Sequence, residues 1–486
     1  MRRAMPSIQL EHKYWVFLVC VIGIFITVFD TSSSIVALPT IAEEFGTDLL
    51  TAQWVIAGNG LTIAALLVPM GKLSDVLGRK RIYVVGALIF AIGALLGALA
   101  GSIYGLIAAR VCVGIGSAMT QAAGMAILVT SFDAGERAKM LGLQLGAVGL
   151  GSIVGPATGG IVVGTLGWRV LFAITAAGML AVAIGAQRTL RRREQRPKSV
   201  EPFDYLGALL SSTFLVALLL SLTLGPTLGW LAPTTLAGAL AAVLLLALFV
   251  ALERRTVAPM LDLALFRRAE FALGALAALV AFMGIAAIRF LVPFFLQNVR
   301  GYTAATVGLL IVPAAVITAI AAPFAGRLAD RWGVRLFANI GLGVTIVGFA
   351  VFTLVHATTP IWVVVVGLMI MSFGMAVFGA PNSASILNCV DESAQGATAG
   401  FVSLCRNSGN VIGVTFGTVV VTLTMGAAGY PPSLVAIDPN ADPGILAAFS
   451  SGIDVAATLL AALATVVLAI VVLWSWRASR AAATPR

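Results

Sequence analysis

Uninterrupted apolar runs recur along the whole chain, and they restrict its fold more than any other feature. A helix needs about 20 apolar residues to cross a bilayer, and the bilayer core offers its backbone no hydrogen-bonding partners. Of the 486 residues, 60% are hydrophobic and only 10% are charged, whereas soluble domains carry roughly 25% charged residues. The sequence therefore predicts an all-α polytopic membrane protein and excludes a soluble globular enzyme.

The apolar runs, and the Gly and Pro residues that divide them, predict fourteen transmembrane helices. Two long uncharged stretches each contain two spans, and they are divided by "GPTLGWLAP" and "HATTP". "MRRAMPSIQLEHKYW" leads directly into the first span, so we expect no cleavable signal peptide. The predicted spans are 14–38, 51–70, 82–100, 103–129, 140–164, 170–187, 205–224, 233–252, 272–298, 304–325, 336–355, 361–386, 396–425 and 455–476.

Lys and Arg residues are distributed unevenly between the two sides of the predicted bundle. With the N-terminus in the cytoplasm, 25 of the 30 fall in cytoplasmic segments, and only Arg169 and Arg300 fall outside. Cytoplasmic loops carry an excess of Lys and Arg, so we expect both termini to be cytoplasmic and the protein to lie in the plasma (inner) membrane. The net charge of +10 follows from this topology. It does not indicate nucleic-acid binding, because a basic soluble face is missing.

A charged motif occurs twice and divides the chain into halves. "GKLSDVLGRK" follows the second span, and "GRLADRWGVR" follows the tenth. This spacing predicts two six-helix bundles with a two-helix insertion, and such parallel repeats are typical of secondary transporters with a substrate site between the halves. The expected segments are an N-tail 1–13, a first bundle 14–187, a basic linker 188–204, an inserted hairpin 205–252, a linker 253–271, a second bundle 272–476 and a C-tail 477–486.

Three motifs resemble those of the major facilitator superfamily, and more narrowly its 14-spanner drug/proton antiporter branch. "GKLSDVLGRK" is similar to the loop motif between spans 2 and 3, "GSIVGPATGG" to the antiporter motif of span 5, and "FDTSSSIVALP" to the first-span signature. The sequence departs from the family pattern at Ile35, Asn59 and Val113, where Asn, an aromatic residue and Gln are usual. These positions are expected to line the cavity, so the departures concern the substrate range.

The resemblance implies that the two charged loops are cytoplasmic gates that latch the halves together. A short turn requires glycine for a close backbone approach or a positive φ, and Asp75 can accept hydrogen bonds from Arg79 or from amides at a helix N-terminus. Alternatively, the loop only anchors the topology, although a second copy with its own Asp favours the latch. The gating residues are Gly71, Asp75, Gly78, Arg79 and Lys80, and in the second copy Gly326, Asp330, Arg331 and Gly333.

Span 5 carries glycines four residues apart, which places them along one face of a helix. Small residues let helices approach closely, and a proline allows a kink. Close packing alone would explain this pattern, whereas the resemblance implies a seam that seals the carrier against proton leak. The motif residues are Gly151, Gly155, Pro156, Gly159 and Gly160, and Gly409 and Gly413 repeat the spacing in span 13.

Asp30 is the only acidic residue that falls inside a predicted span, which makes it a functional-site hypothesis because charge is costly in lipid. Asp30 lies roughly 13 Å, and Arg110 roughly 10 Å, below the outer ends of their spans, so the two can form a pair. Burial favours the protonated carboxyl, and a neighbouring arginine favours the anion. We expect Asp30 to be the proton-coupling site, tuned by Arg110; a static ion pair between spans 1 and 4 is the alternative.

Polar and basic residues of other spans are candidates for lining the substrate cavity. The amides can instead join helices through hydrogen bonds, Arg289 can extend outward to the membrane surface, and Arg406 can pair helices. Together Asp30, Arg110 and Arg289 carry a charge of +1, which disfavours lipophilic dications and leaves neutral, zwitterionic and anionic substrates. The candidate cavity residues are Asn59, Gln121, Arg289, Asn382 and Arg406.

These observations predict a proton-coupled secondary transporter that exports amphipathic small molecules, such as drugs and antibiotics, by alternating access. The alternatives are an exporter of lipids, an uptake or uniport carrier for a metabolite, and a non-transporting receptor or scaffold. The sequence contains no G-x-x-x-x-G-K-[ST] loop and no H-E-x-x-H motif, so we expect no enzyme activity, metal or cofactor. The expected partners are the substrate, protons and the lipid bilayer, with no nucleic acid and with a monomer as the functional unit.

Overall fold

The computed structural model describes residues 6–131, 134–190, 204–229, 232–255, 263–390, 395–430 and 442–483. Within these ranges the secondary structure is helical, without strands, and fourteen helices are long and apolar enough to cross a membrane. The predicted fold class and the number of spans are therefore confirmed.

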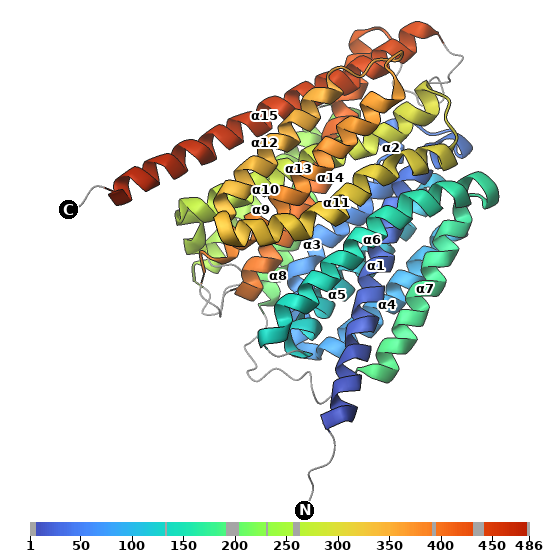
Figure 1. The fold of residues 1–486 in the computed structure, drawn as a ribbon. Helices are drawn as coiled ribbons and strands as arrows, with labels where there is room; N and C mark the ends of the chain where they lie inside the picture. Colours follow the sequence, from blue (N-terminus) through green and yellow to red (C-terminus); the bar gives the residue numbers. More distant parts are fainter. Residues whose placement is uncertain are drawn as a thin grey trace, which may run out of the picture.

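The first six spans form one bundle, coloured blue to green in Figure 1. Its helices are α1 (Pro6–Glu44), the short α2 (Leu49–Ala52) leading into α3 (Trp54–Leu77), α4 (Arg79–Ala98), α5 (Ile103–Ser131), α6 (Ala134–Leu166) and α7 (Trp168–Thr189).

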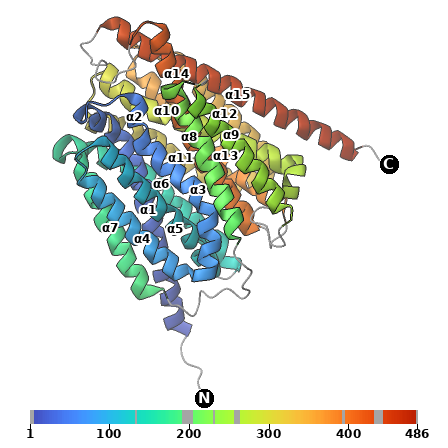
Figure 2. The same ribbon diagram turned by 180° about the vertical axis from the view of Figure 1, so that it is seen from behind.

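The last six spans form the second bundle, coloured yellow to red, with α15 on its outer side (Figures 1 and 2). A 3₁₀ turn, η1 (Leu263–Arg267), leads into it, and a π-helical turn, η2 (Phe295–Val299), extends its first helix. Its helices are α10 (Ala269–Phe294), α11 (Ala304–Trp332), α12 (Val334–Phe352), α13 (Ile361–Leu387), α14 (Gln395–Ala427) and α15 (Pro443–Ala483).

The two bundles repeat the same close contact between corresponding helices. A Cβ atom added at Gly155 of α6 would lie 3.1 Å from the carbonyl oxygen of Phe29 in α1, and one added at Gly413 of α14 would overlap the carbonyl oxygen of Met283 in α10. Glycine at these positions lets the helix backbones approach closely. Thus α6 packs on α1 as α14 packs on α10, and Phe29 corresponds to Met283.

A second contact fixes the register of another pair of helices. A Cβ atom at Gly93 of α4 would lie 2.7 Å from the backbone nitrogen of Val113 in α5, and one at Gly348 of α12 would lie 2.7 Å from the backbone nitrogen of Met371 in α13. Val113 therefore corresponds to Met371. This correspondence allows the two halves to be compared residue by residue.

The inserted hairpin consists of α8 (Tyr205–Leu228) and α9 (Pro233–Glu253). Near one end of α8, Ser212 donates to the carbonyl oxygen of Ala65 in α3 at 2.8 Å. Near its other end, the hydroxyls of Thr223 and Thr415 of α14 are 2.9 Å apart. Thus α8 lies across both bundles, while α9 packs against α8 at the edge of the molecule (Figure 2) and exposes leucines along its outer face.

The charged motifs contain less loop than we predicted. Gly71 lies inside α3, which continues to Leu77, and Gly326 lies inside α11. The prediction that both glycines of the first motif form a turn is therefore wrong for Gly71. A single residue separates the helices in each copy: Gly78 with φ of 100° and Gly333 with φ of 104°. The charges mark where a helix leaves the lipid, whereas the positive φ marks where it ends.

Two terminal spans are longer than predicted for the same reason. The first span was expected at 14–38, but α1 continues to Glu44 and contains Pro39. The last was expected at 455–476, after an external connector, but α15 already begins at Pro443. Both sequence boundaries follow the limits of the apolar run, and a helix can continue beyond the bilayer.

Candidate functional site

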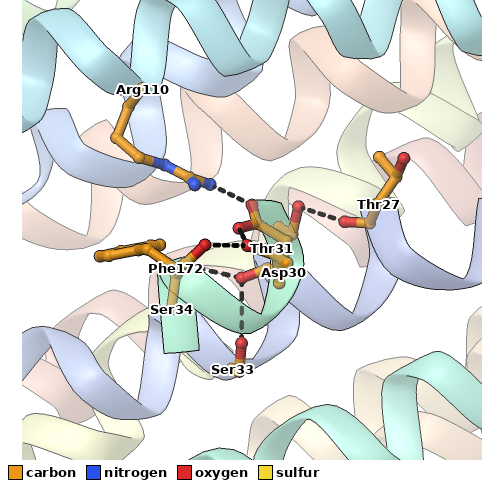
Figure 3. A network of polar contacts seen from close by, with 8 residues as sticks. Thr27, Asp30, Thr31, Ser33, Ser34, Arg110 and Phe172 are labelled. Atoms are coloured by element: carbon orange, nitrogen blue, oxygen red, sulfur yellow. Dashed lines mark hydrogen bonds and ion pairs between the residues drawn. The ribbon is translucent and has the colours of Figure 1, made fainter. Parts of the chain in front are cut away.

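Asp30 of α1 and Arg110 of α5 form an ion pair inside the first bundle (Figure 3). Arg110 Nη2 lies 2.7 Å from Asp30 Oδ2, and both side chains are only 1% exposed. Thr175 of α7 donates a hydrogen bond to Asp30 Oδ1 at 3.2 Å. The guanidinium carbon of Arg110 lies 5.3 Å from the centre of the Phe172 ring of α7. Helices α1, α5 and α7 therefore enclose the pair.

The ion pair is held by charge more than by hydrogen-bond geometry. Although Nη2 and Oδ2 are close, neither has an aligned hydrogen-bond partner among the described residues, and within the same residues Nε and Nη1 of Arg110 also lack acceptors. A guanidinium carries five N–H donors. Buried donors without partners are costly, so this arrangement is less favourable than a fully bonded pair and favours exchange of partners.

Local sequence explains why the Asp30 carboxylate is left available to Arg110. The hydroxyls of Ser33 and Ser34 donate to the Asp30 carbonyl oxygen, at 3.2 and 2.6 Å, rather than to its carboxylate. Such back-bonding to the preceding turn is typical of serine within helices. The serine run therefore satisfies its own helix and leaves the carboxylate to α5 and α7.

The C-terminal end of α1 is fixed against α7. The Glu44 carboxylate accepts hydrogen bonds from Trp168 Nε1 at 2.5 Å and from Arg169 Nη1 at 2.6 Å. Because Thr175 lies on the same helix as these two residues, the contact positions α7 beside Asp30. Counted from Glu44, Asp30 is about 21 Å along the axis of α1, a distance that includes the part of α1 beyond the apolar run.

The corresponding place in the second bundle holds no charge. The residue after Phe29 is Asp30, whereas the residue after Met283 is Gly284. Arg110 lies three residues before Val113, and Leu368 lies three residues before Met371, so Leu368 corresponds to Arg110. Leu368 is buried. A side chain at Gly284 would overlap the buried ring of Phe349. The same helix arrangement is thus filled by apolar groups in one half and by an ion pair in the other.

The antiporter motif packs on two helices at once. Gly151, Gly155 and Gly159 face α1 within the first bundle. On the adjacent face, a side chain at Gly160 would overlap the carbonyl oxygen of Ala304 in α11, and one at Gly308 of α11 would overlap that of Pro156. Pro156 and Gly160 therefore form a backbone-to-backbone seam between the two halves.

Gln297 forms a second contact between the halves, close to the same end of the bundle. It lies in η2, donates from Nε2 to the Val36 carbonyl oxygen at 3.0 Å, and accepts from Thr40 Oγ1 at 3.3 Å. A π-helical turn is often found at functional positions. Our sequence analysis did not select Gln297, although an amide inside the predicted span 272–298 was the available signal.

The candidate cavity residues occupy several places. Gln121 lines a small cavity inside the first bundle, whereas Asn382 lines another inside the second and donates to the Gly274 carbonyl oxygen at 3.0 Å. Asn59 is buried, and its side-chain oxygen has no hydrogen-bond partner in the part of the chain that the structure describes. The structure therefore does not gather these three amides into one pocket.

The two basic candidates lie on neighbouring helices of the second bundle. Arg289 of α10 is half-buried and donates to the hydroxyl of Ser372 in α13 at 3.4 Å. Arg406 of α14 is half-buried too. Neither has an acidic partner among the residues that the structure describes.

Residues of the first charged motif hold helices of their own bundle together. Arg79 Nη1 donates to the carbonyl oxygen of Ala126 in α5 at 3.2 Å, and Lys80 Nζ donates to that of Gln187 in α7 at 2.6 Å. The side chains of Asp75 and Asp330 lie outside the described residues. Arg331 is exposed, and the latch between the halves stays a prediction.

A polar cluster around Glu270, at the end of the second bundle where α10 begins, was not predicted from the sequence. Glu270 of α10 accepts from Arg335 Nε of α12 at 2.6 Å and from the Ser385 hydroxyl of α13 at 3.1 Å. Burial, and then the negative charge of Glu270, raise the pKa of the nearby Cys389 thiol. Glu270 precedes the predicted span 272–298 by two residues, so it was not among the acidic residues found within spans. In the described part of the chain, no group of three or more His, Cys, Asp and Glu side chains could hold a metal ion.

Comparisons with known proteins agree with this fold. The Major Facilitator Superfamily profile matches residues 20–414. The riboflavin transporter RibZ of Clostridioides difficile is 30% identical over 410 residues, which cover 84% of this chain and 88% of that protein. The multidrug resistance protein Stp of Mycobacterium tuberculosis is 31% identical over 398 residues, covering 81% and 73%. The crystal structure of a bacterial homologue of the human lysosomal transporter Spinster aligns with a TM-score of 0.69 at 18% identity, over 97% of each chain.

Proposed function

The chain belongs to the major facilitator superfamily, and from this premise we propose that it is a proton-coupled exporter of amphipathic small molecules that works by alternating access. Its relatives include proteins named for multidrug resistance, as well as a riboflavin transporter. We place it in the plasma (inner) membrane with both termini in the cytoplasm, and we take the monomer as the functional unit.

The observation that carries the proposal is the charge asymmetry between the halves. A buried ion pair is seldom more stabilising than well-packed apolar residues, and the second bundle fills the corresponding place with Gly284, Leu368 and Phe349. The fold therefore does not require charge at this position. Asp30 and Arg110 consequently fit a functional role better than a purely structural one.

The chemistry of the pair suits proton exchange. In this proposal the Asp30 carboxylate takes up a proton after the Arg110 guanidinium has moved away from it, and releases the proton when the guanidinium returns. Arg110 has unused N–H donors with which to bind other acceptors. In the proposed cycle, rearrangement of α1 against α5 and α7 exposes Asp30 to the outside, where it takes up a proton that is later released to the cytoplasm.

The seam formed by Pro156, Gly160, Ala304 and Gly308 and the hydrogen bonds of Gln297 support the alternating part of the proposal. These contacts join the halves at the end where α1 finishes, which the Lys and Arg distribution assigns to the outside. They would close the outer path in this conformation and separate when the carrier turns outward.

Purified protein in liposomes with an imposed pH gradient tests the proposal. Wild type should accumulate a panel of labelled amphiphiles when the gradient is present, and the Asp30→Asn variant should still bind them but lose the gradient's effect. Equal transport by both proteins with and without the gradient would show that Asp30 is structural. That result would favour uniport of a metabolite. Uniport is the second candidate because one relative is named as a riboflavin transporter.

A further inference from the structure

We infer that the transported molecules carry an anionic group, and that Arg289 is the residue that binds it. This inference rests on the proposed transport function and names the class of its substrate. It depends on three features of the molecule: the surroundings of Arg289, the position of Arg406, and the balance of charge among the buried groups.

Arg289 lies too deep to reach the membrane surface. It precedes Val299, the last residue of η2, by about 15 Å along the helix axis, which exceeds the length of its side chain. Its neighbours Ile288 and Phe290 are fully buried, so this part of α10 is enclosed by protein. The guanidinium turns sideways to Ser372 of α13 instead of outward. The interpretation of Arg289 as a residue that extends to the lipid surface is therefore wrong.

The guanidinium of Arg289 has donors to spare. Among the described residues its one hydrogen bond goes to the Ser372 hydroxyl and is long at 3.4 Å. A guanidinium offers five donors in a planar fork that fits carboxylate and phosphate oxygens. Arg289 is half-buried rather than sealed, and we take its remaining donors to be within reach of a small molecule between the halves.

Arg289 and Asp30 lie in opposite halves, about 15 Å and about 21 Å before the ends of η2 and α1. Gln297 of α10 contacts Val36 and Thr40 of α1, and the two helices cross the membrane in the same direction. Two turns before these contacts lie Arg289 on α10 and Asp30 on α1. Asp30 is nevertheless bound to Arg110 and Thr175, so it does not neutralise Arg289.

Arg406 adds a second positive charge nearer the cytoplasmic end. Gly417 of α14 packs against Ala287 and Leu291, which places it level with Arg289. Arg406 precedes Gly417 by about 16 Å along the axis, so one small anionic group cannot touch both arginines. The two arginines instead place two positive charges at different depths along the neighbouring helices α10 and α14.

The charge balance leaves an anion as the matching ligand. The Asp30–Arg110 pair is neutral overall, whereas Arg289 and Arg406 have no acidic partner among the described residues. Unpaired charge within the membrane is costly and normally finds a counter-charge. A substrate carboxylate, phosphate or phenolate would supply it at Arg289, while a lipophilic cation would be repelled.

Binding to the purified full-length protein in detergent tests this inference without requiring proton coupling. Fluorescein, which is anionic, and rhodamine 123, which is cationic, share a xanthene skeleton and can be compared by fluorescence anisotropy. Wild type should bind fluorescein more tightly. Arg289→Gln should weaken fluorescein binding by about ten-fold or more, as expected for loss of a charge-assisted hydrogen bond, and Arg289→Lys should restore part of it.

Arg255→Gln serves as the control, because it removes the same charge from an exposed position at the end of α9. It should leave the binding of both dyes unchanged. Tighter binding of rhodamine 123 by wild type, or an equal loss of both dyes in Arg289→Gln, would overturn the inference. Either result can occur in a protein that still exports its substrate under a pH gradient. Conversely, a carrier that binds fluorescein through Arg289 can still lack proton coupling. The proposal of proton-coupled export and the inference of an anionic substrate can therefore fail independently.

Discussion

The Asp30–Arg110 pair allows a double-mutant test that separates function from stability. Arg110→Leu introduces the residue type found at the corresponding position of the second bundle, and leaves the Asp30 carboxylate with only the Thr175 hydroxyl. Asp30→Asn conversely leaves a buried guanidinium without a counter-charge. Removing one partner of a buried pair costs about 3–5 kcal/mol, so each single variant should be clearly less stable than wild type.

The double variant Asp30→Asn/Arg110→Leu contains no buried charge at this site. An Asn side chain can still accept from Thr175, and Leu loses mainly the contact of the guanidinium with the Phe172 ring, which is worth about 0.5–2 kcal/mol. We therefore expect the double variant to be more stable than either single variant, although it should not couple transport to protons.

Thermal unfolding in detergent, followed with a thiol-reactive dye, measures this difference, because Cys20 and Cys405 are buried in the folded protein. The functional interpretation requires a stable but uncoupled double variant. A double variant as unstable as the worse single variant would show that the fold needs the ion pair. Retention of gradient-driven transport would refute the assignment of Asp30.

The contacts between the halves give two further predictions. Gly160→Ala should abolish transport, because the new methyl group overlaps the carbonyl oxygen of Ala304. Gly164→Ala should preserve transport, because its methyl group lies 3.6 Å from the nearest neighbouring atom. Equal transport rates of the two variants in the liposome assay would contradict the contact between the halves at Gly160. Gln297→Ala removes two hydrogen bonds between the halves, worth about 1–3 kcal/mol together, and should favour the outward-open state. A cysteine placed at Ile35, a half-buried residue that makes neither hydrogen bond, in a background without native cysteines should then react several-fold faster with an impermeant maleimide. An unchanged rate would argue against this contact.

Much of the fold could be predicted because lipid leaves few choices. The number of spans follows from apolar runs of sufficient length, and the repeated motif identifies the two halves. The helix ends could not be predicted in this way. Gly71 and Gly326 lie within helices, and the turns fall at Gly78 and Gly333, because charge sets the membrane boundary while backbone conformation sets the helix boundary.

The candidate site was partly predictable for a similar reason. Charge is rare within spans, so Asp30, Arg110 and Arg289 could be selected from the sequence alone. Their surroundings could not: Thr175 and Phe172 lie far from Asp30 along the chain and are ordinary residues for a membrane helix. Gln297 acts through backbone and side-chain contacts across the two halves, which depend on how the bundles meet. Amides such as Gln121 and Asn382 can line a cavity or join helices through hydrogen bonds, so the sequence could not assign them to one cavity.

Proton movement driven by substrate tests the central claim, antiport through Asp30, most directly. Liposomes that contain the protein and an internal pH-sensitive dye would be given a substrate gradient without a pH gradient, and exchange of labelled for unlabelled substrate would be measured in parallel. Wild type should change the internal pH as substrate moves, while Asp30→Asn should exchange substrate without moving protons. Substrate-driven proton movement of equal size in both proteins would contradict the account.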